Sequence, residues 1–462
     1  MKNTSHRYLI KILLPLLILC LFTGCRRASS SPESMGTQSD SNIGGTTSQD
    51  TTADTPLHED GRAIVTLSVF YETDDITTAV AAFNKTNRDY YVEILTADNN
   101  TSAEDFWDRE RIEIMAGKGP DLFTKNAHTE FMTYVEKGVI EDLAPYIERD
   151  INKEDYWENS LYAYEYEGKV YAIENYFTIS FLVGSKDLFE DASGWNLKQA
   201  MQLMEAHPEV LTFKSYSSPG SFLRDYLAFG AVDYTDYDAI RRCIEFDKAY
   251  SKELPISTPV IPGKSVLVTG EDLQSIIGWA DYEALYGQEL SPIGYVNEQK
   301  EGILHSSIAW SINAASKQKE GAWAFLKFLL SVEYQREYLS GSPFSPLKAI
   351  FMEQLEFYSK PITTTFYSEE LDETITITQN HTLSRASGTL GEIIEIEQMT
   401  EKQLQTVVDM IESAKVNCFT WDQTAIQIIT EEAQAYFVNQ RSLDDVMANI
   451  QNRMDLYMSE KE

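Results

Sequence analysis

Aromatic and carboxylate or amide side chains stand together at several points where predicted strands end. Flat aromatic faces pack against the C–H surface of a ring, while carboxylates and amides accept hydrogen bonds from hydroxyl groups. This combination is typical of a site that holds a sugar. Aromatic residues mostly fill protein cores, so each candidate is also a candidate core residue. The candidates are Tyr71, Glu72, Asn99, Trp107, Tyr176, Phe177, Trp279 and Asp281.

Residue patterns that would carry out chemistry on a ligand are few. The six histidines are scattered, and the chain has no HExxH and no CxxC spacing, so we expect neither a metal nor a cofactor. A Gly-x-Ser-x-Gly elbow and a phosphate-binding Gly-rich loop are also missing from the sequence. The acidic pairs Glu165 with Glu167 and Asp281 with Glu283 keep a polysaccharide hydrolase as an alternative. With 72 acidic residues such pairs arise by chance, so we expect no enzyme.

The first 25 residues have the layout of an export signal. A basic start precedes the apolar run 12–22, which is shorter than the ~20 residues that span a bilayer. The run stops at Thr23, Gly24 and Cys25, which resembles the lipobox of bacterial lipoproteins. We expect residues 1–24 to be a signal peptide and Cys25 to carry the lipid anchor. The protein would then act outside the cytoplasm, on the outer face of the cytoplasmic membrane.

Composition limits the rest of the chain. Residues 25–62 are rich in Ser, Thr, Gly and Asp, which predicts a flexible tether. About 400 residues remain, too many for one core, which indicates two lobes. The formal net charge of −34 argues against a nucleic-acid partner, because phosphate binding needs clustered cations. We expect a monomer.

Two cysteines remain in the folded part, Cys243 and Cys418. We favour two buried free thiols, and a single disulfide between them stays open.

Strand and helix patterns alternate after the tether. Strands are predicted over 64–70, 90–95 and from 121, and helices over 76–83 and 104–116. Alternation of this kind implies a parallel sheet covered by helices, an α/β fold. Residues 276–279 are predicted to form a strand that ends at Trp279.

Most of the later chain is predicted to be helical. Helices are expected over 195–204, 236–250 and 317–330, the last with Ser316 as its N-cap, and further helices follow Thr400, Ile426 and Ser442. Alternation of Thr and Ile over 374–378 predicts a surface hairpin.

Several blocks of the chain resemble the extracellular solute-binding proteins of bacterial ABC importers, the family 1 group that includes maltose-binding protein. One block holds Gly117, Pro120 and Asp121 in a Gly-x-x-Pro-Asp pattern. The segment 362–397 does not match the group. The blocks are residues 64–87 with 117–123, 138–147, 312–326, and 428–437 with 450–460.

The resemblance implies a two-lobed fold of the periplasmic-binding-protein type II, with the ligand in a cleft between lobes and a helical C-terminal region. Lobe 1 would comprise 63–173 plus 292–342, and lobe 2 would comprise 174–291 plus 343–462, with crossings near Ile173, Pro292 and Pro343. A Trp at the position of Trp279 would stack on the ligand.

In function, the resemblance implies capture of a solute, favouring a carbohydrate, by hinge closure and its delivery to an ABC permease in the membrane. The ligand's identity stays open. A ligand sensor with the same fold is a further alternative.

Overall fold

The structure is a computed structural model of the 462-residue chain. Residues 55–462 form one compact unit. Cys25, Asn99 and Cys418 lie outside the described residues, as do the predicted signal peptide and most of the predicted tether. The structure describes residues 56–98, 100–125, 131–189, 196–206, 211–212, 219–229, 233–250, 267–294, 303–305, 308–338, 343–368, 371–379, 381–384, 393–396, 398–415 and 422–461.

The first sheet has four strands in the order β11-β3-β1-β2. Strands β1, β2 and β3 run parallel, and β11 pairs with β3 in the antiparallel sense. Parallel strands place their carboxyl ends at one edge of the sheet. The alternation of these strands with helices confirms the predicted α/β fold. The strands are β1 (Ala63–Ser68), β2 (Tyr90–Leu95), β3 (Leu122–Lys125) and β11 (Ala309–Ile312). Their helices are α2 (Asp74–Thr86), α3 (Ala103–Met115), α4 (Phe131–Glu136) and α12 (Lys319–Leu329).

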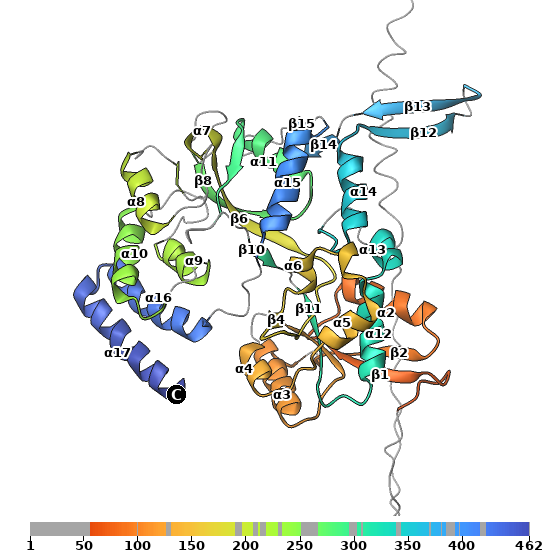
Figure 1. Cartoon of the computed structure of the whole chain (residues 1–462), viewed down its shortest axis with the longest axis horizontal. Coiled ribbons are helices and arrows are strands. Elements are labelled where there is room, and N and C mark those ends of the chain that lie inside the picture. The colour runs from red at the N-terminus through yellow and green to blue at the C-terminus, as the bar shows by residue number, and fades with distance from the viewer. Residues whose placement is uncertain are drawn as a thin grey trace, which may run out of the picture. The chain divides into compact units, whose positions relative to one another are not determined.

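Helices α2 and α12 pack closely around this sheet (Figure 1). The hydroxyl of Thr73 caps α2, and the predicted apolar face of α2 is buried. In α12, a Cβ at Gly321 would lie 2.5 Å from the Tyr90 ring and 2.7 Å from Val65. Only glycine lets this helix approach the strands so closely. The predicted cap Ser316 does not cap α12; its hydroxyl donates to Asp121 at 2.6 Å and ties the helix to the loop before β3.

A second sheet forms around the long strand β6. It has five strands in the order β10-β6-β8-β7, and β9 also pairs with β6. The strands are β6 (Thr178–Ser185), β7 (Leu211–Thr212), β8 (Leu267–Leu273), β9 (Leu290–Pro292) and β10 (Ile303–His305). The helices near them are α7 (Lys186–Phe189), α8 (Leu197–Ala206), α9 (Ser221–Phe229), α10 (Tyr237–Tyr250) and α11 (Gly278–Tyr286).

The strand predicted over 276–279 is wrong, because Trp279 lies in the first turn of α11. Ile276 and Ile277 belong to the turn before this helix, and Gly287 ends it in the left-handed conformation at φ 62°. A short apolar run does not distinguish a strand from a buried helix start, which explains the error.

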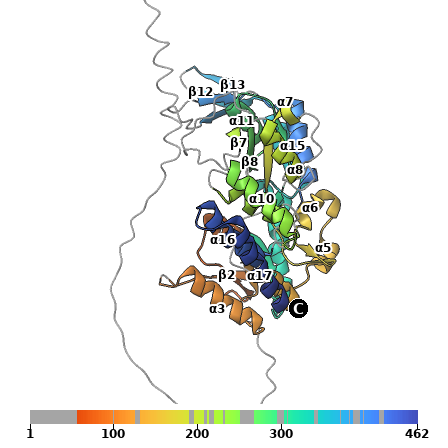
Figure 2. The same ribbon diagram turned by 90° about the vertical axis from the view of Figure 1, so that its left-hand side faces the viewer.

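The C-terminal third is mainly helical, as predicted. Helix α15 begins with the capping box of Thr400 and Gln403. Helices α16 and α17 pack against each other, α16 also packs against α9, and α17 packs against α10. Figure 2 shows α16 and α17 beside α10. The predicted hairpin is present as β12 and β13, whose side chains are mostly exposed. The bounds are α13 (Val332–Tyr338), α14 (Lys348–Tyr358), β12 (Ile362–Ser368), β13 (Glu373–Gln379), β14 (His381–Ser384), β15 (Ile393–Ile396), α15 (Glu401–Ser413), α16 (Gln423–Phe437) and α17 (Leu443–Lys461).

Between the first-sheet elements and β6 lie several short elements. They are α5 (Ala144–Asp150), a 3₁₀ turn η1 (Lys153–Asp155), α6 (Glu158–Leu161), β4 (Glu165–Tyr166) and β5 (Lys169–Val170). Strands β4 and β5 form a hairpin that leads toward β6.

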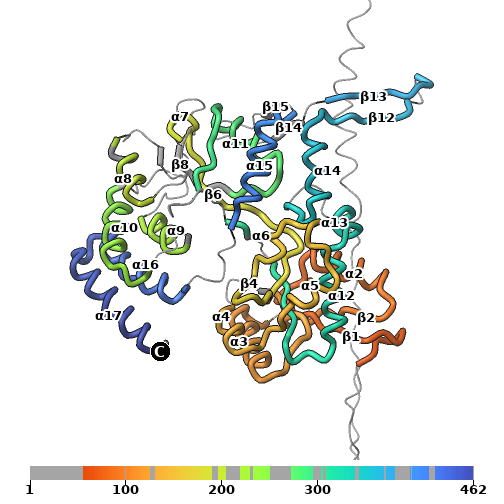
Figure 3. Tube along the Cα trace, in the orientation of Figure 1, coloured from red at the N-terminus to blue at the C-terminus, as the bar shows by residue number. Residues whose placement is uncertain are grey.

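Segments that pass from one sheet to the other pair with each other. Ile173 forms a bridge with Trp310 of β11, and Phe177 forms a second bridge with Phe344. Figure 3 traces the chain through the two sheets. Pro292 ends β9 inside the second sheet, so the passage back to the first sheet comes later, between β10 and β11. The side chain of Gln335 donates to the Asn175 carbonyl at 2.8 Å and accepts from Ser345 at 2.6 Å. The lobe boundaries themselves remain a prediction.

Candidate functional site

An aromatic cluster stands at the carboxyl end of β1. It consists of Phe70 and Tyr71, which follow the strand, and of Phe106 and Trp107 from α3. The ring centroids of Phe70 and Trp107 are 6.1 Å apart, and those of Phe106 and Trp107 are 4.7 Å apart with an edge-to-face arrangement. Tyr71 is 65% exposed. The structure therefore brings the predicted site residues Tyr71 and Trp107 to one place and leaves Tyr71 accessible to a ligand.

A buried carboxyl group lies beside this cluster. Glu110, one turn after Phe106 and Trp107 on α3, is only 6% exposed and shares a hydrogen bond with Ser68 at the end of β1. Its Oε1 is buried without a hydrogen-bond partner. Burial raises the pKa of Glu110 to about 7. The carboxyl group is therefore neutral over much of the acidic range, as expected for an acid taken out of water.

A small cavity opens a few residues further along the chain. Its volume is about 160 Å³, room for about five water molecules. Tyr176 lines it, as do Asp74 and Asp75 in the first turn of α2. Asp74 follows Tyr71 by three positions, so the aromatic cluster and this cavity are at most about 10 Å apart along the backbone. The other lining residues are Ile76, Thr78, Ala79, Asn175, Ile308, Trp310, Tyr334 and Tyr338.

The cavity wall combines aromatic rings with acceptors for hydroxyl groups. Tyr334 and Tyr338 stack with their centroids 5.2 Å apart, and the Trp310 indole donates to the Asn175 side chain at 2.9 Å. Burial, with the negative charge of Asp75, raises the pKa of Tyr334. Among the described residues, none donates a hydrogen bond to the carboxylates of Asp74 or Asp75. These carboxylates remain able to accept hydrogen bonds from a bound solute.

The other predicted site residues are placed differently. Glu72 is exposed next to Tyr71, whereas Phe177, Trp279 and Asp281 are buried. Phe177 packs on Phe344 with ring centroids 5.6 Å apart, and Trp279 packs on Phe181 at 6.0 Å. Trp279 is 1% exposed. A role of these buried residues in ligand binding remains a prediction.

The cavity-lining residues that sequence patterns missed include Asp74, Asp75, Tyr334 and Tyr338. The two aspartates were available as polar residues directly after Tyr71 and Glu72. The two tyrosines are spaced i and i+4 on α13, the spacing of one helix face. Only the fold brings that face to the end of β1, some 260 positions earlier in the chain.

The structure places the two members of each acidic pair that suggested a hydrolase in different local surroundings. The Glu283 carboxylate accepts from the Gln403 amide at 2.7 Å and from the Leu290 backbone N–H at 3.1 Å. Residues two apart on a helix do not face each other, which separates Asp281 from Glu283 on α11. In the second pair, Glu165 lies in β4 while Glu167 lies in the following turn at φ 50°.

Within the described part of the chain, no three His, Cys, Asp or Glu side chains are grouped to hold a metal ion. None of the described helices combines the length and the apolar character that crossing a membrane requires. Cys243 is a buried free thiol, and burial raises its pKa well above the usual value.

Two α/β sheets, joined by paired crossing segments beside an aromatic and acidic cavity, define a protein built to hold a small solute. A model of the bacterial extracellular solute-binding protein family matches residues 78–350, more than half of the chain, and the chain belongs to this family. No curated protein matches the sequence.

Solved structures show the same fold. The sugar-binding protein MalE from the phytopathogen Xanthomonas citri is 14% identical, with a TM-score of 0.53 over 86% of this chain and 98% of that one. The family 1 extracellular solute-binding protein from Alicyclobacillus acidocaldarius is 13% identical, with a TM-score of 0.50 over 86% and 98%. The predicted two-lobed, type II binding-protein fold is thus confirmed.

Proposed function

We propose that this protein captures a carbohydrate outside the cytoplasm and delivers it to an ABC importer. The supporting observation is the gathering of tyrosine rings and unengaged carboxylates at the carboxyl end of β1, beside the segments that join the two sheets. Ligands of open α/β sheets bind beyond the carboxyl ends of the strands. The likeness in fold to a sugar-binding protein supports a carbohydrate as the ligand.

In this proposal Tyr71 and Trp107 offer ring faces to the sugar. The carboxylates of Glu72, Asp74 and Asp75 accept hydrogen bonds from its hydroxyl groups. Tyr176 lines the cavity near Tyr334. Closure of the two lobes around the crossing segments then buries the sugar and presents a surface to the permease that the open form lacks.

No step of this function changes the sugar chemically. Binding without turnover is the expected result when the protein is incubated with glycans and the products are analysed. Release of shortened sugars at a catalytic rate would contradict the proposal and return the hydrolase alternative.

A thermal-shift screen against a panel of mono- and oligosaccharides tests the ligand class. A sugar at a hundred times its Kd adds about 2.7 kcal/mol to the stability of the folded state. The shift should disappear in the double variant Tyr71→Ala, Trp107→Ala and persist in Phe357→Ala, which removes an exposed ring from α14. If a sugar raises the melting temperature of both variants equally, the ligand binds elsewhere.

The proposal also includes an anchor. Cys25 would carry lipid after removal of residues 1–24, with residues 25–62 as a tether, so that a monomer stays beside its permease. Support comes from the basic start, the apolar run and the Gly24-Cys25 junction. Mass spectrometry of the mature N-terminus is the test. A mature chain that begins at another residue and carries no lipid would contradict the anchor.

Uptake measurements separate transport from sensing. Deleting the gene should abolish import of the bound sugar if the protein serves a permease. Unchanged uptake, with a lost transcriptional response to that sugar, would support the sensor instead.

A further inference from the structure

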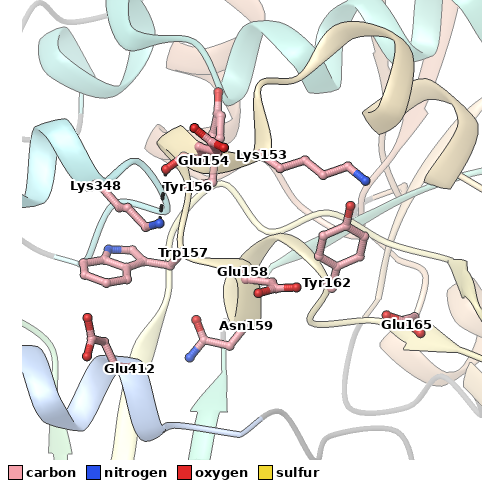
Figure 4. A pocket seen from close by; sticks show the side chains of 10 residues that line it. All are labelled: Lys153, Glu154, Tyr156, Trp157, Glu158, Asn159, Tyr162, Glu165, Lys348 and Glu412. Atoms are coloured by element: carbon pink, nitrogen blue, oxygen red, sulfur yellow. Dashed lines mark hydrogen bonds between the residues drawn. The ribbon is translucent and has the colours of Figure 1, made fainter.

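A second cavity lies away from the candidate ligand site. Its volume is about 890 Å³, within the range of sites for small organic ligands. It shares no lining residue with the smaller cavity and includes none of the aromatic cluster at β1. The segment from η1 to β4 forms one wall, and the start of α14 and the end of α15 form the other (Figure 4). The lining residues are Lys153, Glu154, Tyr156, Trp157, Glu158, Asn159, Tyr162, Glu165, Lys348 and Glu412.

The wall is held in place by bonds between these elements. The Asn159 amide donates to the carbonyls of Ile411 and Ala414, at 2.7 and 2.8 Å, and so fixes α6 to the end of α15. The Tyr156 hydroxyl donates to the Leu330 carbonyl at 2.8 Å. The cavity is thus bounded by elements that are bonded to one another across long stretches of sequence.

Both lysines of the cavity are already engaged. The Lys348 ammonium lies 5.6 Å from the centre of the Trp157 ring and donates to the Glu154 carbonyl at 3.1 Å. The Lys153 ammonium lies 5.6 Å from the Tyr162 ring and 3.4 Å from the Glu148 carboxylate.

Three carboxylates of the wall are in the opposite situation. Among the residues that the structure describes, Glu158, Glu165 and Glu412 have no hydrogen-bond or ion-pair partner for their side chains. They offer acceptor oxygens to whatever enters the cavity.

The wall also holds an unused donor. Trp157 is only 7% exposed, and its indole N–H has no hydrogen-bond partner. Figure 4 shows the indole nitrogen on the ring edge that faces Lys348. Buried donors are nearly always paired, so an unpaired one calls for an acceptor. The Lys348 side chain is flexible, so an oxygen that enters beside it can accept hydrogen bonds from the ammonium and from the indole N–H.

We propose that this cavity is a second binding site, for a saccharide. Hydroxyl groups are both donors and acceptors of hydrogen bonds. One saccharide can therefore donate hydrogen bonds to Glu158, Glu165 and Glu412 and accept one from the Trp157 indole N–H. A simple organic amine satisfies the carboxylates but leaves the indole N–H without an acceptor. A saccharide in this site joins η1, α6 and β4 to α14 and α15.

The site is tested with maltotriose, cellotriose and chitotriose as probes. The full chain is titrated calorimetrically with each, and the Trp157 indole N–H is followed by NMR after assignment with Trp157→Phe. At least one probe should bind and move this resonance. The variant Glu158→Gln, Glu412→Gln should weaken that binding at least tenfold. The control Glu136→Gln, Glu245→Gln removes equal charge from exposed positions outside the cavity and should bind as the wild type does.

The variant Tyr71→Ala, Trp107→Ala separates this site from the candidate ligand site. The Trp157 response should persist in that variant whether or not the proposed function holds. The second site is refuted if no probe moves the Trp157 resonance, or if binding is equal in the Glu158 and Glu412 variant and its control. A response to spermidine alone, lost in that variant, would show an amine site and overturn the saccharide.

Discussion

Two groups of aromatic residues come after strands in this protein, and the fold treats them in opposite ways. After β1, Phe70 and Tyr71 meet Trp107 in a cluster whose outer ring is mostly exposed. After β8, Trp279 packs on Phe181 and is fully buried in the core of the second sheet. The difference comes from the segment after each strand. Residues 69–73 lead from β1 to α2 as a loop that ends in the polar Glu72 and Thr73, whereas a turn leads from β8 directly into α11.

We propose from this comparison that the first group contacts the ligand and that the second group serves packing. Replacing Trp279 by Ala tests it most strongly, because a buried Trp lost to Ala costs about 3 to 5 kcal/mol. Urea unfolding of the apo protein should show this loss, and Trp279→Phe should cost less. If Trp279→Ala keeps the apo midpoint and loses only the ligand shift, Trp279 belongs to the ligand site as its sequence context predicts.

The next largest effect concerns Glu110 beneath the exposed cluster. Its pKa rises from 4.5 in a free carboxyl to about 7. In the unfolded chain the Glu110 carboxyl group loses its proton at a lower pH than it does in the folded protein. The wild-type folded state therefore loses stability as the pH rises from 4.5 to 7. Glu110→Gln removes this loss and should be more stable than wild type by about 3 kcal/mol at pH 8, with no difference at pH 4. Glu93→Gln, an exposed change on β2, is the control. A pH-independent effect of Glu110→Gln would contradict the buried acid.

A smaller effect is expected for the half-buried ring of the cluster. Trp107→Ala should weaken sugar binding about tenfold, which corresponds to ~1.4 kcal/mol. Calorimetric titration measures the change, and Phe357→Ala on α14 should leave affinity unaltered. Equal affinity in Trp107→Ala and wild type would remove α3 from the proposed site.

The smallest effect should be that of Tyr71→Ala on apo stability. Exposed substitutions away from special features stay within about 0.5 kcal/mol. The same variant should lower sugar affinity, because its ring is free to meet a ligand. A large loss of apo stability would show that the cluster is part of the core. The cluster and Trp279 would then both serve packing.

Local patterns predicted the first sheet well. The period of Val65 and Leu67 marks β1, and the spacing of Ile76, Val80 and Phe83 marks the buried face of α2. These signals lie within a few residues of the structure they specify.

Candidate site residues were harder to predict, for a physical reason. Tyr71 and Trp279 are both aromatic residues after an apolar run, yet one is exposed and the other buried. Burial depends on which elements cover a position, and those elements come from distant parts of the chain. Tyr334 joins the cavity with Asp75 for the same reason, because α13 returns to the end of β1 through tertiary packing alone.

The position of β11 has a consequence for the order of folding. Strand β3 ends at Lys125, but its antiparallel neighbour β11 begins only at Ala309, after the strands of the second sheet. A chain emerging residue by residue therefore cannot complete its first sheet until most of the second is also present. Such non-local pairing slows folding.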